Sequence, residues 1–195
     1  MSIRSADGEE LTVDHVVIAA GGWLPTLAAG LPFRLPSLRV TKEQAYHFPY
    51  RDAGTDWPTT VHIRDDIAAY SLPGGRDAGH RGHKVAEFLG GPDIMSAAGN
   101  DGIIDPGNRQ RVVDYVTRYL PGLIPEPYAE TTCVFTSTPS EDFVIDTVGP
   151  FTVASPCSGH GAKFAPLLGA IIAASALGIA APADRFRTSS RASRA

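Results

Sequence analysis

The segment 151–164, FTVASPCSGHGAKF, holds residues whose types and spacing suit ligand binding. An apolar run leads to two closely spaced glycines, Gly159 and Gly161, and an uncharged, alanine-rich run follows. This order predicts a strand, a tight turn and a helix, because glycine lets the backbone turn sharply and approach a ligand closely. The start of the helix would offer unpaired N–H groups to an anion or an electron-rich oxygen. A β–α connection without any ligand fits the pattern equally well.

The same turn does not match two better-known loops. Gly159-His160-Gly161 fits only the start of the dinucleotide fingerprint G-x-G-x-x-G, because Phe164 stands at the third glycine and no acidic residue follows at the expected distance. Ser158 lacks the G-x-S-x-G context of a hydrolase nucleophile. We therefore expect neither a pyrophosphate loop nor a hydrolase site here.

Four other side chains are reactive by type, but none of them indicates a function when considered alone. Cys133, in an apolar stretch, has the usual setting of a small buried hydrophobe. His80 and His83 form an H-x-x-H pair, yet no cysteine or carboxylate stands at ligand spacing, so we expect no metal site. Lys84 by itself is typical of a surface lysine.

Taken in order along the chain, these motifs resemble FAD-dependent amine oxidases of the monomeric sarcosine oxidase and N-methyltryptophan oxidase type, in the D-amino-acid-oxidase-like superfamily. Segment 133–146, CVFTSTPSEDFVID, resembles the segment with the flavin-linked cysteine. SGHGAKF at 158–164 is similar to their Ser-Gly-His-Gly-Phe-Lys-Phe, and HKV at 83–85 to their Leu-Lys-Leu or Ile-Lys-Val. HVVIAAGGW at 15–23 resembles the strand that passes under the cofactor, and Tyr70 matches a tyrosine of the substrate pocket.

The resemblance, which runs from about residue 10 to about residue 180, implies how the cofactor is held. The cofactor would be FAD, attached covalently by a thioether between Cys133 and the 8α carbon of the isoalloxazine ring. The glycine turn would surround the pyrimidine edge, and the helix after it would stabilise negative charge on the reduced ring. The implied cofactor-binding residues are Cys133, Ser158, Gly159, His160, Gly161 and Lys163.

The resemblance also implies a reaction and its catalytic residues. A secondary amine or N-methyl amino acid would lose two electrons from its C–N bond, with O₂ as the acceptor and imine and hydrogen peroxide as products. Lys84 would lie near flavin N5 and favour the reduction of O₂. Lys163 would pair with the substrate carboxylate, and Tyr70 would line the substrate pocket.

The chain departs from the pattern of these oxidases at several places. Phe88 stands where they have a histidine four residues after the lysine, and Phe135 stands where they have a tyrosine two residues after the cysteine. Both changes favour a bulkier or more apolar amine than sarcosine. The N-terminal G-x-G-x-x-G unit and an early pocket arginine are also missing, and the Asp7-Gly8 turn predicts a chain that opens in the middle of a sheet.

Hydrophobic periodicity places these motifs on elements of a mixed α+β and α/β fold. Residues 108–120 form an amphipathic pattern typical of a helix, with Asn108 as its cap. Residues 11–20 predict a strand buried on both faces. We expect further strands at 39–50, 59–63, 68–72, 83–88, 130–136, 142–146 and 151–155, and a helix at 163–177.

This order predicts an antiparallel, mixed-sheet substrate domain at 39–147, inserted between two pieces of an incomplete FAD-binding α/β domain at 1–38 and 148–195. The net charge of −4 without a basic stripe argues against nucleic acid as a partner. The alanine-rich run at 164–181 is typical of a buried helix and not of a membrane span. Two cysteines and a polar start predict a reduced, cytoplasmic protein.

Three interpretations remain open at this level. The chain is a piece or subunit of an oxidase, completed by a partner that carries the dinucleotide-binding unit. Alternatively, it is an inactive remnant whose first strand has an exposed edge. The third possibility is an unrelated binding module that uses the turn at Gly159 to hold an anion.

Overall fold

The computed structural model describes residues 1–52, 54, 57–64 and 66–188. It is a mixed α/β protein with several sheets. The chain divides into two compact units: unit 1 comprises Met1–Arg39 with Thr136–Ala195, and unit 2 is Val40–Phe135. Unit 2 is therefore inserted in the sequence of unit 1.

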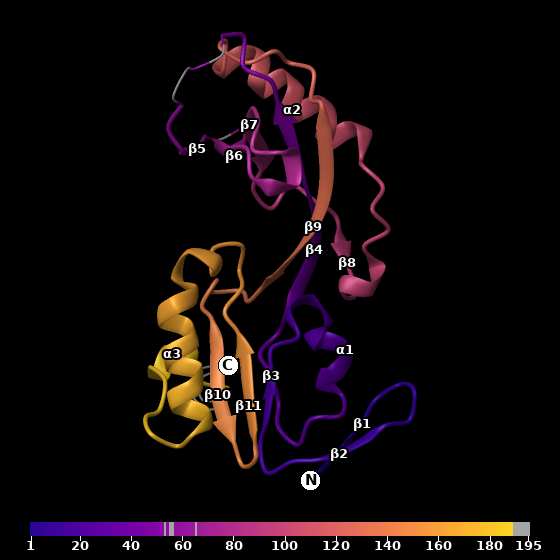
Figure 1. The fold of residues 1–195 in the computed structure, drawn as a ribbon, viewed down its shortest axis with the longest axis vertical. Coiled ribbons are helices and arrows are strands. Elements are labelled where there is room, and N and C mark those ends of the chain that lie inside the picture. The colour runs from indigo at the N-terminus through magenta and orange to yellow at the C-terminus, as the bar shows by residue number, and fades with distance from the viewer. Residues whose placement is uncertain (53, 55–56, 65, 189–195) are drawn as a thin grey trace. The chain divides into compact units, whose positions relative to one another are not determined.

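Unit 1 contains a hairpin, a three-stranded sheet and two α-helices (Figure 1). In the sheet, β11 lies between β10, its antiparallel neighbour, and β3, its parallel neighbour. Helix α3 packs on the β10–β11 side through Leu168, which contacts Phe143 and Ile145. The elements are β1 (Ser2–Arg4), β2 (Glu10–Thr12), β3 (Val16–Ile18), α1 (Leu24–Ala28), β10 (Val144–Val148), β11 (Phe151–Ser155) and α3 (Ala165–Ala176).

Unit 2 contains one sheet, in which strands β4 to β8 pair antiparallel, and one long helix, α2. The strands follow the spatial order β5, β6, β7, β4, β8, and β9 also pairs with β4. Helix α2 packs on the sheet face that carries Tyr46, Phe48 and Val85 (Figure 1). The elements are β4 (Arg39–Phe48), β5 (Thr60–Ile63), β6 (Ala68–Pro73), β7 (His83–Glu87), β8 (Asp93–Ile94), α2 (Pro106–Tyr119) and β9 (Ala129–Ser137).

The expected helix at 108–120 is confirmed as α2, but its expected cap is wrong. The Oδ1 atom of Asp105 accepts a hydrogen bond from the Gly107 amide at 2.8 Å, and Pro106 occupies the first turn. Proline favours this position because its fixed φ suits a helix start and its missing N–H is not needed there. Asn108 is instead buried within the helix, where it accepts a hydrogen bond from the Tyr46 hydroxyl at 2.8 Å.

The expected continuous strand at 11–20 is also wrong. The structure divides it into β2, which belongs to the hairpin, and β3, which belongs to the three-stranded sheet. Val17, in the middle of β3, is 48% exposed, so this strand is not buried on both faces. A run of apolar residues indicates strand propensity, whereas burial depends on which elements pack on the strand.

Candidate functional site

One face of the sheet in unit 2 gathers Tyr70 and Lys84. Lys84 lies opposite His47 of β4 and Leu72 of β6, and Tyr70 lies opposite Ala86. Paired residues share a face of a sheet, and side chains alternate between faces along a strand. Tyr70, His47 and Lys84 therefore share the face opposite α2, because Tyr46 of the same strand packs toward α2.

Cys133 lies on this same face. In β9, Glu130 forms an ion pair with Arg109 of α2, with Nε 2.7 Å from Oε1, so Glu130 faces the helix. Cys133 is three residues further along the strand and therefore faces the opposite side. We call the side of the sheet with Tyr70, Lys84 and Cys133 the site face.

Burial and two nearby charges set the pKa of the Cys133 thiol. Burial raises its pKa, the nearby Lys84 ammonium lowers it, and the Glu43 carboxylate raises it. Burial is the largest of these effects, so Lys84 does not bring the thiol below its ordinary pKa. The same environment raises the pKa of Tyr70 to about 12, chiefly through burial and then through Cys133 and Glu43. Tyr70 therefore keeps its proton and can donate a hydrogen bond at neutral pH.

The two phenylalanines that replace polar residues of the resembled pattern contact each other. The rings of Phe88 and Phe135 have centroids 5.8 Å apart at an interplanar angle of 56°. Phe88 is four residues after Lys84, and Phe135 is two residues after Cys133. Residues an even number of positions apart along a strand share a face, so both rings also belong to the site face. They form an apolar wall beside the charged groups, and their packing is favourable in itself.

The predicted turn in unit 1 is tight and strained. Ser158 and Gly159 both adopt positive φ, of 52° and 72°, which costs free energy at serine but little at glycine. The Ser158 amide donates to the Thr136 carbonyl at 2.8 Å. At Gly161 a Cβ atom would lie 1.6 Å from the Pro156 carbonyl oxygen, so only glycine fits. The backbone here is held in an unusual shape, as at many ligand-binding turns.

His160 and Lys163 are oriented around this turn. The Nδ1 atom of His160 donates to the Ser158 carbonyl at 2.7 Å, and its ring lies 5.1 Å from that of Phe143. Lys163 is exposed, with its Nζ 5.6 Å from the centre of the Phe164 ring. A short 3-10 turn, Ala162–Phe164, then leads into α3. The structure thus groups Ser158, Gly159, His160, Gly161 and Lys163 at the start of one helix.

Each of the two groups, considered separately, suits contact with a flavin. The site face offers a thiol for attachment and an ammonium beside it, and the turn offers a close backbone approach with the positive end of a twelve-residue helix. The first group belongs to unit 2 and the second to unit 1.

Besides His47, sequence reasoning missed an acidic residue of the site face, Glu43. It lies on β4 two positions from Ala45 and four from His47, so it shares their face, and it is only 2% exposed. The alternation of polar residues in the predicted strand at 39–50 was the available signal. It could not tell which of the two faces would pack against the helix.

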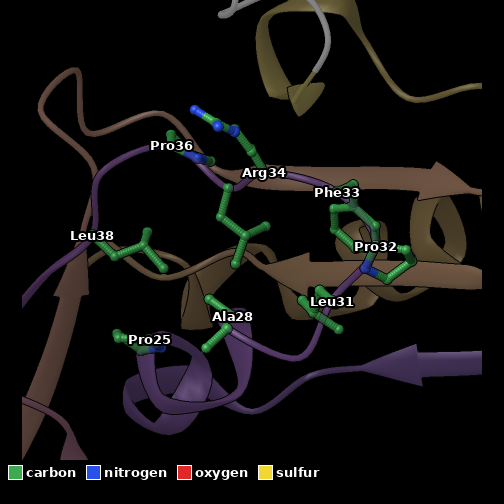
Figure 2. Close-up of a pocket in the computed structure, with 10 residues that line it drawn as sticks. Pro25, Ala28, Leu31, Pro32, Phe33, Arg34, Pro36 and Leu38 are labelled. Atoms are coloured by element: carbon green, nitrogen blue, oxygen red, sulfur yellow. The ribbon is translucent and has the colours of Figure 1, made fainter.

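One cavity of the described part of the chain contains none of these residues in its lining (Figure 2). It has a volume of about 650 Å³ and lies in unit 1, between α1 and the segment that follows it. Its lining is apolar except for Arg34 and contains no predicted site residue. Among the described residues, no three His, Cys, Asp or Glu side chains are grouped as metal ligands. Across the same part of the chain, every helix is too short or too polar to span a bilayer.

Comparison with known proteins identifies the class. The family model described as "FAD dependent oxidoreductase" matches residues 2–175, so the chain belongs to that family of oxidoreductase enzymes. Among curated relatives, a monomeric sarcosine oxidase of Streptomyces avermitilis is 32% identical over 181 residues, which are 85% of this chain and 44% of that protein. An N-methyl-L-tryptophan oxidase of Yersinia pestis is 32% identical over 177 residues, 87% of this chain and 45% of that protein.

Solved structures support the fold. NikD, described as an unusual amino acid oxidase essential for nikkomycin biosynthesis, superposes with a TM-score of 0.80 at 19% identity. This similarity covers 96% of this chain and 51% of that one. A fructosyl peptide oxidase from E. terrenum superposes with a TM-score of 0.72 at 20% identity, over 95% of this chain and 47% of that one. The chain thus spans about half the length of the relatives it matches.

Proposed function

We propose that this chain is the flavin-contacting and substrate-side half of an FAD-dependent amine oxidase. Such an enzyme oxidises the C–N bond of a secondary amine or an N-methyl amino acid and uses O₂ as the acceptor. The observation that carries the proposal is the shared site face of Tyr70, Lys84 and Cys133. Family membership and relatives named as sarcosine and N-methyl-L-tryptophan oxidases agree with it.

Bound FAD would supply the two-electron chemistry, with imine and hydrogen peroxide as the final products. Cys133 would attach the isoalloxazine ring covalently, and Lys84 beside it would place a positive charge where O₂ becomes negatively charged. Tyr70 would orient the substrate through its protonated hydroxyl. Lys163 would pair with a substrate carboxylate.

Taken by itself, the turn in unit 1 would also suit contact with a flavin. Its strained backbone and the start of α3 suit an electron-rich carbonyl or ring nitrogen, with Gly159 and Gly161 allowing close approach. Phe88 and Phe135 replace polar groups by an apolar wall, so we infer a substrate with an apolar portion larger than that of sarcosine.

We further propose that the dinucleotide-binding portion of such oxidases docks on unit 1. Within the described residues, strand β3 is the last strand of its sheet and pairs only with β11, in parallel. Parallel strands are usually covered on both faces. Helix α3 contains no charged residue, yet Leu167 on it is 63% exposed. An apolar helix of this kind is typical of a buried element. The portion could belong to the same protein or to a partner chain.

The alternative function is a catalytically inactive remnant. The exposed edge of β3 and the exposed apolar residues of unit 1 favour it if no dinucleotide-binding portion is supplied. Two free cysteines lead us to expect a cytoplasmic location for the oxidase half and for the inactive remnant alike.

The test is covalent attachment of FAD. The chain is incubated with FAD, alone and with the dinucleotide-binding portion of the Streptomyces avermitilis relative, and is then precipitated with acid. We expect flavin absorbance in the pellet and none in that of Cys133→Ser. Cys157→Ser, which removes the other thiol, is the matched control and should retain the flavin. A colourless pellet from the unmodified chain in both conditions supports the inactive remnant, and a yellow pellet from Cys133→Ser refutes the attachment site.

A further inference from the structure

The ring of Phe143, which directly precedes β10, contacts two other rings of unit 1 that are distant in the sequence. Its centroid lies 5.1 Å from that of the His160 imidazole, at an interplanar angle of 34°. It also lies 5.6 Å from that of Phe186, at an angle of 40°. Phe143 is only 8% exposed and packs against Ile145 and Leu168. Because close-packed side chains do not move independently, Phe143 links the position of Phe186 to that of His160.

Two carboxylates hold the segment 184–188 near both of its ends. Asp142 Oδ1 accepts a hydrogen bond from Arg185 Nε at 2.9 Å. Asp146 Oδ2 accepts two from Thr188, one from the amide at 2.9 Å and one from the hydroxyl at 2.6 Å. Asp146 is only 4% exposed, so water competes little for these bonds. The segment that carries Phe186 is therefore anchored beside the start and the middle of β10.

The hydrogen bond of His160 defines which of its ring nitrogens carries the proton. Its Nδ1 atom lies 2.7 Å from the Ser158 carbonyl oxygen. A carbonyl oxygen can only accept, so Nδ1 is the protonated nitrogen of the neutral imidazole, and Nε2 keeps a lone pair. The half-buried His160 ring thus offers an acceptor at the glycine turn.

We propose that Phe143 and Phe186 are positioning residues for His160. Through them, the anchored segment 184–188 holds the imidazole in its Nδ1–H form and keeps Nε2 a hydrogen-bond acceptor for a ligand of the turn. The inference rests on the proposed function, because it assigns a role to one cofactor-contacting residue of that proposal. An acceptor suits the N–H group in the pyrimidine ring of a flavin. Without this support, the imidazole would rotate, lose its bond to Ser158 and form the Nε2–H tautomer.

Nuclear magnetic resonance reads the tautomer of His160 without any flavin. Correlation of the ring nitrogens with the carbon-bound ring protons distinguishes a protonated nitrogen from an unprotonated one. His160→Gln identifies the signals of this ring among those of the six histidines in the chain. The same ring protons also report the contact with Phe143, because a nearby aromatic ring shifts their frequencies.

We expect Phe186→Ala to lower the ratio of the Nδ1–H to the Nε2–H tautomer of His160 roughly fivefold, the effect of weakening one hydrogen bond. Phe186→Leu, which keeps a large apolar side chain, should retain most of the ratio. Phe33→Ala is the matched control. It removes another half-buried ring of unit 1, one that contacts Phe151 instead, and should leave the ratio within about twofold. An unchanged ratio in Phe186→Ala with native circular dichroism overturns the proposal, as does an equal fall in Phe33→Ala.

A second variant tests the proposal if Phe186→Ala does not fold. Arg185→Gln combined with Thr188→Val removes two side-chain anchors of the segment 184–188 and leaves every aromatic ring in the chain. The tautomer ratio of His160 should then fall about twofold or more. A ratio that stays flat in this double variant overturns the proposal. Failure of the proposed function is seen separately, as a colourless pellet in the FAD assay, because the resonance measurement involves no flavin.

Discussion

At the scale of single residues, opposing influences set the pKa of the Cys133 thiol. Its burial favours the neutral form, and so does Glu43, whereas Lys84 favours the thiolate. A nucleophilic cysteine usually has a depressed pKa, so the described chain holds this thiol in a less reactive state. Covalent attachment to Cys133 would therefore depend strongly on the Lys84 ammonium. Attachment to an exposed thiol would depend less on a nearby cation.

The first prediction concerns the pH dependence of Cys133. In the Cys157→Ser background, the rate of alkylation by iodoacetamide should continue to rise above pH ~8.5, the ordinary midpoint of a thiol. The midpoint shifts upward because the pKa of Cys133 is raised, so the thiol of the folded chain keeps its proton to higher pH. Lys84→Met should move the midpoint further up. A midpoint at or below the ordinary value would contradict the burial that the structure assigns to this thiol.

The second prediction concerns a buried polar contact in unit 2. Asn108 accepts from the Tyr46 hydroxyl and donates to Glu87 Oε2, each at 2.8 Å. Asn108→Ala leaves a buried hydroxyl and a carboxylate without these bonds, so we expect the free energy of unfolding to fall by about 2–3 kcal/mol. Urea denaturation followed by circular dichroism measures it. The exposed change Gln110→Ala should cost less than about 0.5 kcal/mol, and equal effects would disprove the role of Asn108.

At the scale of elements, the start of α2 depends on a cap outside the periodic pattern. Asp105 precedes Pro106, and its side chain accepts from the Gly107 amide. The apolar stripe identified the helix correctly because its period is local, but the stripe cannot identify the cap. A cap is defined by backbone geometry at one residue, and several residues near 105 have suitable side chains.

The third prediction follows from this cap. Asp105→Ala should lower the free energy of unfolding by about 1 kcal/mol, because one amide of the first turn loses its acceptor. Asp105→Ser should restore most of that loss, since serine also caps helices. Asp114→Ala, on the exposed side of the same helix, serves as the control for removing a negative charge. If Asp105→Ala and Asp114→Ala destabilise equally, the cap assignment is wrong.

At the scale of the whole molecule, the chain corresponds to less than half of two named relatives and carries exposed apolar surface on unit 1. Adjacent residues of α3 show the contrast: Leu168 is buried against the sheet, and Leu167 is exposed. A helix without charges normally has partners on every side. Its exposed side is therefore where we place the dinucleotide-binding portion.

The fourth prediction uses these neighbouring leucines as a matched pair. Leu167→Glu should leave the circular dichroism of the chain unchanged but weaken its co-purification with a tagged dinucleotide-binding portion at least tenfold. Leu168→Glu should unfold unit 1, because it buries a charge against Phe143 and Ile145. Undiminished co-purification of Leu167→Glu would show that the portion docks elsewhere.

The sequence by itself determined the family resemblance and most of the elements. Strands and helices follow from local hydrophobic periodicity, so β7, α2 and α3 formed close to where the pattern predicts them. The glycine turn could also be predicted, because Gly159 and Gly161 adopt a backbone shape that other residues resist. The notable errors, the cap of α2 and the burial of residues 11–20, concern interactions that the pattern does not encode.

Only the tertiary structure decided which side chains share a face. Cross-strand register brings Tyr70, Lys84 and Cys133 to one side of the sheet, together with Glu43, which sequence reasoning did not identify. It also brings Phe88 into contact with Phe135, 47 positions away in the sequence. Register is fixed by pairing between distant strands, and a shift of one residue would turn each side chain to the opposite face. Local sequence cannot supply that information, because the partner strand is chosen by the packing of the whole sheet.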